Sequence, residues 1–173
     1  QRYYNTFCEQ MTTELVTRYG KFFFIWFDGG AHGPEQGGPD ILPIVAKHHP
    51  DAIFYHNLQR ADVRWGGSES GTVPYPCWAT FDHPSWFQYS GAKDNFKPIK
   101  NGSENGKYYM PAMADAPLRG FKGRHEWFWE PGDEQYIFPV DKLVDMYYGS
   151  AGHNATLILG LTPDPNGLIP QPD

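Results

Sequence analysis

Two acidic residues occupy positions from which a carboxylate could do chemistry. Asp28 follows the apolar block 22–27 and precedes two glycines, and Glu69 lies among small residues in segment 66–71. A carboxylate at the end of a buried strand costs free energy unless it is paired, hydrogen-bonded or functional, although Asp-Gly is also a common turn pair. Glu69 is either a reactive group in a loop that a ligand can approach closely or a solvated residue paired with Arg64.

Two such carboxylates on one face of a protein favour glycoside hydrolysis. One acts as the nucleophile and the other as general acid and then general base, and a retaining enzyme holds the two carboxyl groups about 5–5.5 Å apart. Aromatic residues make up 17% of the chain, and rigid aromatic surface in glycine-rich loops suits ring-shaped ligands such as sugars. Segment 127–129, Trp-Phe-Trp, is typical of residues in the hydrophobic core and at its edge, and one of its tryptophans could face a sugar ring.

The apolar pattern predicts the elements that position these residues. Helical spacing covers 4–19, and residues 22–27 are apolar on both faces, as in a buried parallel strand. Asp40 is expected to cap a short helix that ends before Pro50. The other expected elements are strands over 52–55, 62–65, 108–112, 126–129 and 156–161, a long aromatic loop over 66–106 and a helix over 140–148.

Helices that alternate with buried strands indicate βαβ units and a parallel sheet. Functional groups of such α/β folds lie at the carboxyl ends of strands, which places Asp28, Arg64, Glu69 and Trp127 on the functional face. The first element is a helix, and a full barrel needs about 250 residues. We therefore expect residues 1–173 to be one domain, the C-terminal half of a (β/α)8-like (TIM) barrel with roughly strands four to eight.

Composition excludes several classes of protein. The net charge of −6 argues against a nucleic-acid partner, and no apolar run approaches the roughly 18 residues that would suggest a membrane partner. Cys8 and Cys77 are too few for a disulfide scaffold or a cysteine zinc site and are expected to be buried or half-buried thiols. His48, His49 and His56 match no zinc spacing, and the first two are expected to be solvated at a helix end.

Four segments, taken in order, resemble the α-L-fucosidases of glycoside hydrolase family 29. They are Tyr19-Gly20 with Trp26-Phe27-Asp28-Gly29-Gly30, Arg64-Trp65-x-Gly67-x-Glu69-x-Gly71, Glu126-Trp127-Phe128-Trp129, and Ser150 to Leu159. The second is similar to the Arg-Trp-x-Gly-Asn-Glu-x-Gly segment of the 1,3/1,4-linkage-specific subgroup. The fourth is similar to the entry into the last barrel strand of that family.

The resemblance implies a role for each candidate residue. Asp28 would be the catalytic nucleophile, Glu69 the acid/base, Arg64 a contact to fucose, and Trp127 part of the fucose pocket near the sugar's methyl group. The resemblance also implies the activity: a retaining exo-glycosidase that hydrolyses terminal α-L-fucosyl linkages of oligosaccharides or glycoconjugates by double displacement. No metal or organic cofactor is expected, because each half-reaction needs only a nucleophile and acid/base catalysis.

The sequence departs from the family pattern at three positions. Ser68 replaces an Asn, Met113 stands where many relatives carry a Glu, and His153 replaces an Arg. The family's fucose-binding histidines and tryptophan come from earlier strands, so the isolated chain is expected to be inactive and to need the first half of the enzyme as its partner. Two alternatives stay open: a non-catalytic carbohydrate-binding fragment and a hydrolase for another sugar. The expected location is extracellular, periplasmic or lysosome-like.

Overall fold

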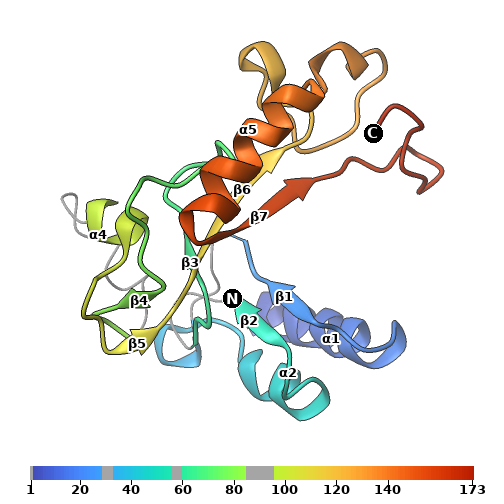
Figure 1. Ribbon diagram of the computed structural model, residues 1–173. Coiled ribbons are helices and arrows are strands. Elements are labelled where there is room, and N and C mark those ends of the chain that lie inside the picture. Colours follow the sequence, from blue (N-terminus) through green and yellow to red (C-terminus); the bar gives the residue numbers. More distant parts are fainter. Residues whose placement is uncertain (1, 29–32, 56–59, 85–95) are drawn as a thin grey trace.

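The computed structural model describes residues 2–28, 33–55, 60–84 and 96–173 (Figure 1). Gly29, Gly30 and His56 lie outside the described residues. The helices are α1 (Arg2–Arg18), α2 (Leu42–His48), α4 (Phe96–Asn101) and α5 (Val140–Ser150), with short 3-10 turns at Pro34–Gln36, Phe121–Gly123, Glu134–Tyr136 and Ala151–His153. The strands are β1 (Phe24–Trp26), β2 (Ile53–Tyr55), β3 (Arg64–Trp65), β4 (Thr80–Phe81), β5 (Tyr108–Tyr109), β6 (Ala112–Pro117) and β7 (Ala155–Gly160).

The strands form two parallel units and one small antiparallel pair. β1 pairs with β2, and β3, β6 and β7 form a sheet in that order. β4 and β5 pair antiparallel. Figure 1 shows α1 and α2 beside the first unit and α5 beside β7 of the second. The prediction of helices alternating with parallel strands is confirmed, but the described residues form small sheets and no closed barrel.

Side chains alternate between two faces of the first parallel unit, as the pleat of a strand requires. Ile25 and Phe54 pack with Val16 of α1 and Val45 of α2, so this face meets the helices. Trp26 and its neighbours on the other face pack into a second cluster. That cluster also contains Tyr55, Val63, Trp65, Phe81 and Met113, so it joins the two parallel units. We call the side with Trp26 the inner face and the side with the helices the outer face.

The second parallel unit follows the same alternation. Ala112 and Ala114 of β6 pack with Val73 and Cys77 on the outer face. Met113, between them, belongs to the inner cluster. Asp115 follows at the same parity as Met113, so the alternation directs its side chain to the inner face as well.

Three expected details are wrong. The N-cap of helix α2 is Ile41, without a side-chain hydrogen bond, and Asp40 before it donates its backbone N–H to Glu9 Oε1 at 3.0 Å. Pro43 in the first turn also removes one N–H that a cap would serve. Residues 126–129 form no strand but a single bridge between Glu126 and Arg119. The segment 66–106 contains β4 and α4 rather than loop alone.

His49 is a buried tie between elements rather than a solvated cap. It is only 7% exposed, its Nε2 lies 2.9 Å from the carbonyl oxygen of Val16, and Phe22 donates its backbone N–H to Nδ1 at 3.3 Å. These two contacts assign the tautomer with hydrogen on Nε2. The sequence gives no sign of this role, because His49 directly follows the exposed His48 at the end of α2.

Candidate active site

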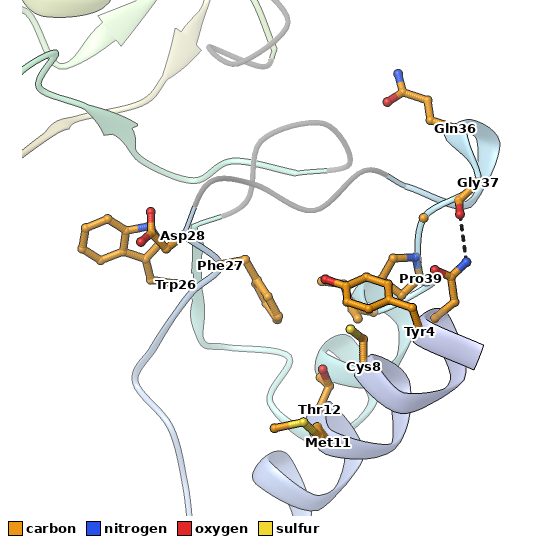
Figure 2. A pocket seen from close by; sticks show the side chains of 13 residues that line it. Tyr4, Cys8, Met11, Thr12, Trp26, Phe27, Asp28, Gln36, Gly37 and Pro39 are labelled. Carbon is orange, nitrogen blue, oxygen red and sulfur yellow. Dashed lines mark hydrogen bonds between the residues drawn. The ribbon is translucent and has the colours of Figure 1, made fainter. Parts of the chain in front are cut away.

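Asp28 lies at the carboxyl end of β1 and is exposed. Figure 2 shows Trp26 and Asp28 projecting to one side of the chain and Phe27 to the other side, toward α1. This alternation follows from the pleat. Asp28 therefore extends the inner face beyond the apolar cluster, where a ligand can reach it.

Asp115 is a third carboxylate on the inner face, and the charges of both predicted carboxylates act on it. It is 1% exposed and accepts a hydrogen bond of 2.9 Å from the indole Nε1 of Trp65. Burial, together with the charges of Glu69 and Asp28, raises the pKa of Asp115 to about 6 against the opposing effect of its hydrogen bonds. Burial also raises the pKa of Tyr55, again with contributions from Asp115 and Asp28. Asp28 and Glu69 thus share one electrostatic neighbourhood centred on Asp115.

The substitution Asp115→Asn should make stability less dependent on pH. A carboxyl group whose pKa is raised in the folded state stabilises the fold below its unfolded pKa of about 3.9, and this contribution is lost as pH rises through about 6. At pH 7 the loss is on the order of 3 kcal/mol. Asn can still accept the Trp65 hydrogen bond but carries no charge, so the variant should gain in melting temperature relative to wild type as pH rises from 4 to 7. Calorimetric scans at several pH values measure this difference, and a difference that is constant with pH would contradict it.

The loop that carries Glu69 is anchored to β6 on both sides. Gly66 donates its N–H to the Met113 carbonyl at 2.7 Å, and Gly71 donates to the Asp115 carbonyl at 2.9 Å. Gly71 has φ +68°, and a Cβ there would lie 2.9 Å from the sulfur of Met146. Backbone conformation and space therefore both require glycine at this position. The same residue, Asp115, fixes the loop through its carbonyl group and Trp65 through its carboxylate.

Three hydroxyl groups inside this loop form a chain. Ser68 Oγ lies 2.9 Å from Ser70 Oγ, which lies 2.9 Å from Thr72 Oγ1. Ser68 is the residue that departs from the family's Asn. In this chain it stabilises the loop next to Glu69 by a hydroxyl contact to the following turn.

Glu69 does not pair with Arg64. Its side chain is 42% exposed, and Oε2 lies 2.5 Å from Nε2 of His125. The indole Nε1 of Trp127 lies 3.1 Å from the same nitrogen, and the two rings meet nearly perpendicular, with centroids 5.8 Å apart. The structure therefore brings Glu69 and Trp127, two of the predicted site residues, together through His125.

The half-buried ring of Trp127 depends on a glycine at the end of β7. A Cβ on Gly160 would lie 2.6 Å from two carbon atoms of that ring. A glycine at this strand end thus permits the close approach of the indole. The apolar surface of β7 fixes one side of the ring.

Arg64 is a buried donor in this structure. Its side chain is 0% exposed and donates to the carbonyl oxygens of Ile99 at 2.7 Å and Met110 at 2.5 Å, and to Cys77 Sγ at 3.2 Å. A side chain without exposed surface cannot touch a sugar in this conformation, so the fucose contact of Arg64 stays a prediction that this conformation does not support. The reason is parity, because Arg64 precedes the inner-facing Trp65 and points to the outer face.

Replacement of Arg64 by Leu should destabilise the fold. The change leaves two buried carbonyl groups without a donor, and at about 1–3 kcal/mol each this predicts a loss of roughly 2–6 kcal/mol in unfolding free energy. Arg18→Leu is the matched control, because Arg18 is 69% exposed and makes only a helical surface pair with Glu14, worth about 0.5 kcal/mol. Denaturant unfolding of both variants in the full-length protein measures the contrast. Wild-type stability of Arg64→Leu with a raised KM would restore the sugar-contact role.

Both cysteines are free thiols, as expected. Cys77 is buried and Cys8 is half-buried. Burial raises the pKa of the Cys77 thiol, with the Arg64 guanidinium opposing that effect. Cys77 is therefore a neutral hydrogen-bond acceptor for Arg64 rather than a reactive group.

A hollow of about 510 Å³ lies between α1 and the end of β1 (Figure 2). Its lining is mostly apolar and includes Tyr4, Met11 and Phe27, and it reaches Asp28 at the end away from α1. Most of this hollow is on the outer face, on the side of Phe27. Asp28 lines this hollow but Glu69 and Asp115 do not, so the hollow does not bring the candidate carboxylates together.

No cluster of three His, Cys, Asp or Glu side chains in ranges 2–28, 33–55, 60–84 and 96–173 has the geometry to hold a metal ion. No helix in the same ranges has the length and apolar character to cross a membrane.

Sequence reasoning missed Asp115 and His125. Asp115 lies beyond the strand predicted over 108–112, and its shared face with Met113 follows only from the observed β6. His125 carried no signal, because its contact with Glu69 joins residues 56 positions apart across an irregular loop.

Several known proteins are similar to nearly the whole chain. No family model matches the chain. It is 28% identical to "Alpha-L-fucosidase 1" of Arabidopsis thaliana over 98% of its own length, and it spans about a third (32%) of that protein. A "putative alpha-L-fucosidase" structure from Bacteroides thetaiotaomicron is 58% identical with a TM-score of 0.90, covering 99% of this chain and 38% of that one. A glycoside hydrolase 29 family member from an unknown rumen bacterium is 26% identical with a TM-score of 0.77, covering 99% and 32%. Over nearly its whole length the chain is thus similar to proteins named α-L-fucosidases and to a member of glycoside hydrolase family 29, and it corresponds to about a third of the length of these relatives.

Proposed function

We propose that the protein containing this chain is a retaining α-L-fucosidase and that this chain supplies its nucleophile, Asp28, and its acid/base, Glu69. The observation that carries the proposal is that both carboxylates lie near enough to Asp115 for their charges to raise its pKa. They come from the end of β1 and from the loop after β3, which lie in different parallel units. Such a pair is what hydrolysis by double displacement requires.

Asp28 would attack the anomeric carbon of the fucose while Glu69 gives its proton to the departing glycosidic oxygen. The bond to the leaving alcohol breaks and a bond to a carboxylate oxygen of Asp28 forms, with inversion at the anomeric carbon. Glu69, now ionised, would take a proton from water, and the water oxygen displaces Asp28 with a second inversion. Fucose leaves with its original anomeric configuration, and both carboxyl groups return to their starting protonation states.

Trp127 would form one wall of the sugar pocket. Its ring is held between Gly160 and His125, within the same contact network as Glu69. An indole face fixed in this way suits the apolar side of a sugar ring, including the methyl group of fucose.

The five strands β1, β2, β3, β6 and β7 would be roughly strands four to eight of a (β/α)8 barrel. Parallel pairing and alternation between an inner and a helix-covered outer face support this assignment. The first half would then cover α1, whose residues Tyr4, Phe7, Met11 and Leu15 are between 42% and 63% exposed at helical spacing. An apolar stripe of this kind indicates a surface that another part of the protein buries.

The direct test uses the full-length protein and a panel of 4-nitrophenyl glycosides. We expect saturable hydrolysis of the α-L-fucoside and none of the β-D-galactoside or the β-D-glucoside. Proton NMR during turnover should show α-L-fucose as the first product, and a 2-fluoro-fucosyl fluoride should label the peptide that contains Asp28. Turnover of another glycoside instead would indicate a hydrolase for another sugar, and binding without turnover would indicate a carbohydrate-binding protein.

A further inference from the structure

The loop before Trp127 presents His125 to the Glu69 carboxylate. We propose that His125 is a positioning residue that holds one oxygen of Glu69 and directs the other toward the glycosidic oxygen. This inference rests on the proposed function, since it concerns how the acid/base does its work. The contact is 2.5 Å between Nε2 of His125 and Oε2 of Glu69, in a region where both side chains stay partly exposed.

The loop that carries His125 is braced on both sides of the histidine. Arg119 and Glu126 form a bridge between backbone segments. Arg124 pairs with Glu130 and lies 3.6 Å from Glu126, and its guanidinium sits 5.0 Å from the ring centre of Tyr136. Arg124 and Glu126, directly before and after His125, are therefore restrained by these contacts. The restrained loop holds the imidazole next to Glu69.

The hydrogen-bond chemistry assigns the proton on His125. An indole nitrogen only donates, so Nε2 can accept from Trp127 or donate to Glu69, but it cannot do both at once. The contact with the carboxylate is 2.5 Å and the contact with the indole 3.1 Å. A bond to a charged acceptor is the stronger of the two, so we assign hydrogen to Nε2, donating to Oε2 of Glu69.

This assignment serves both steps of the reaction. No residue in the described part of the chain hydrogen-bonds the other carboxyl oxygen, Oε1 of Glu69, which leaves that oxygen for the leaving group and then for water. In the first step Oε1 carries the proton, and in the second step Glu69 is ionised. Oε2 accepts from His125 in both states, so the histidine orients Glu69 without itself gaining or losing a proton.

The test compares two variants of His125 in the full-length protein. His125→Phe keeps a planar ring but has no N–H, whereas His125→Gln can place an amide N–H near the position of Nε2. A general acid contributes about 10²–10⁴-fold, and a misdirected acid should lose part of that. We expect His125→Phe to lower kcat/KM about 10- to 100-fold for a fucosyl disaccharide and by less than about threefold for 4-nitrophenyl α-L-fucoside.

His125→Gln should recover most of the loss on the disaccharide, and His48→Phe, a change at an exposed histidine on α2, should leave both substrates unaffected. Melting temperatures check that every variant folds. Equal loss on both substrates, no loss, or no recovery with Gln would overturn the positioning role while wild-type turnover leaves the proposed function intact.

A second readout does not need activity: the imidazole ¹⁵N signal that His125→Phe removes should shift in Glu69→Gln, and an unchanged signal would show that the contact does not exist. A wild-type protein inactive on both fucosides would overturn the proposed function, and the positioning role with it.

Discussion

Asp28→Asn should abolish nearly all fucoside turnover, with kcat reduced on the order of 10⁴-fold or more. The amide has the shape of the carboxylate but cannot form a stable ester with the anomeric carbon, so the covalent route closes. Asp28 is exposed at the end of β1, so the change should leave the melting temperature within about 1 °C because surface substitutions seldom exceed 0.5 kcal/mol. Assays with 4-nitrophenyl α-L-fucoside and thermal scans of the full-length protein provide both measurements.

A nucleophile leaves a stereochemical signature that separates Asp28 from any other essential residue. In Asp28→Ala, added azide can occupy the vacated space and attack the fucoside directly. One inversion then gives the β-fucosyl azide. Asp51→Asn, at an exposed turn after α2, is the matched control and should keep wild-type kcat. A near-normal kcat for Asp28→Asn would remove Asp28 from the mechanism.

The location of Asp28 was predictable because it follows from a local pattern. Six apolar residues that end in an acidic residue predict a buried strand with a carboxylate at its end, and the pleat then sets the face on which Asp28 lies. The same rule, applied to Arg64 and Trp65, would have shown that they face opposite sides. The family resemblance suggested a sugar contact for Arg64, whereas alternation makes it a buried donor to backbone carbonyls.

What the sequence could not predict depends on contacts between distant segments. The position of Glu69 is set by β6 and by His125, 44 or more residues further along the chain. The polar role of His49 likewise depends on Val16, 33 residues away. Barrel closure is not visible in the described residues because β1 and β2 pair only with each other, and β3, β6 and β7 only among themselves.

Glu69→Ala should separate substrates by their leaving groups. A fucosyl disaccharide has a poor leaving group that must be protonated as the bond breaks, so kcat/KM should fall by about 10³-fold, within the usual contribution of a general acid. A 4-nitrophenolate departs with little protonation, so kcat/KM for that substrate should fall by only about tenfold. Steady-state kinetics of the full-length variant on the two substrates measure this ratio.

Azide tests the second role of the same residue, as the base for water. Without Glu69 the fucosyl-enzyme is hydrolysed slowly, whereas an azide anion needs no deprotonation and fits the space that the carboxylate leaves. Because Asp28 has already inverted the centre once, the azide attack produces the α-fucosyl azide, the opposite anomer to the one expected from Asp28→Ala. Glu69→Gln keeps the contact to His125 but cannot exchange a proton, so it should match Glu69→Ala on the disaccharide and respond less to azide. Equal loss on both substrates without an azide product would assign the acid to a different group.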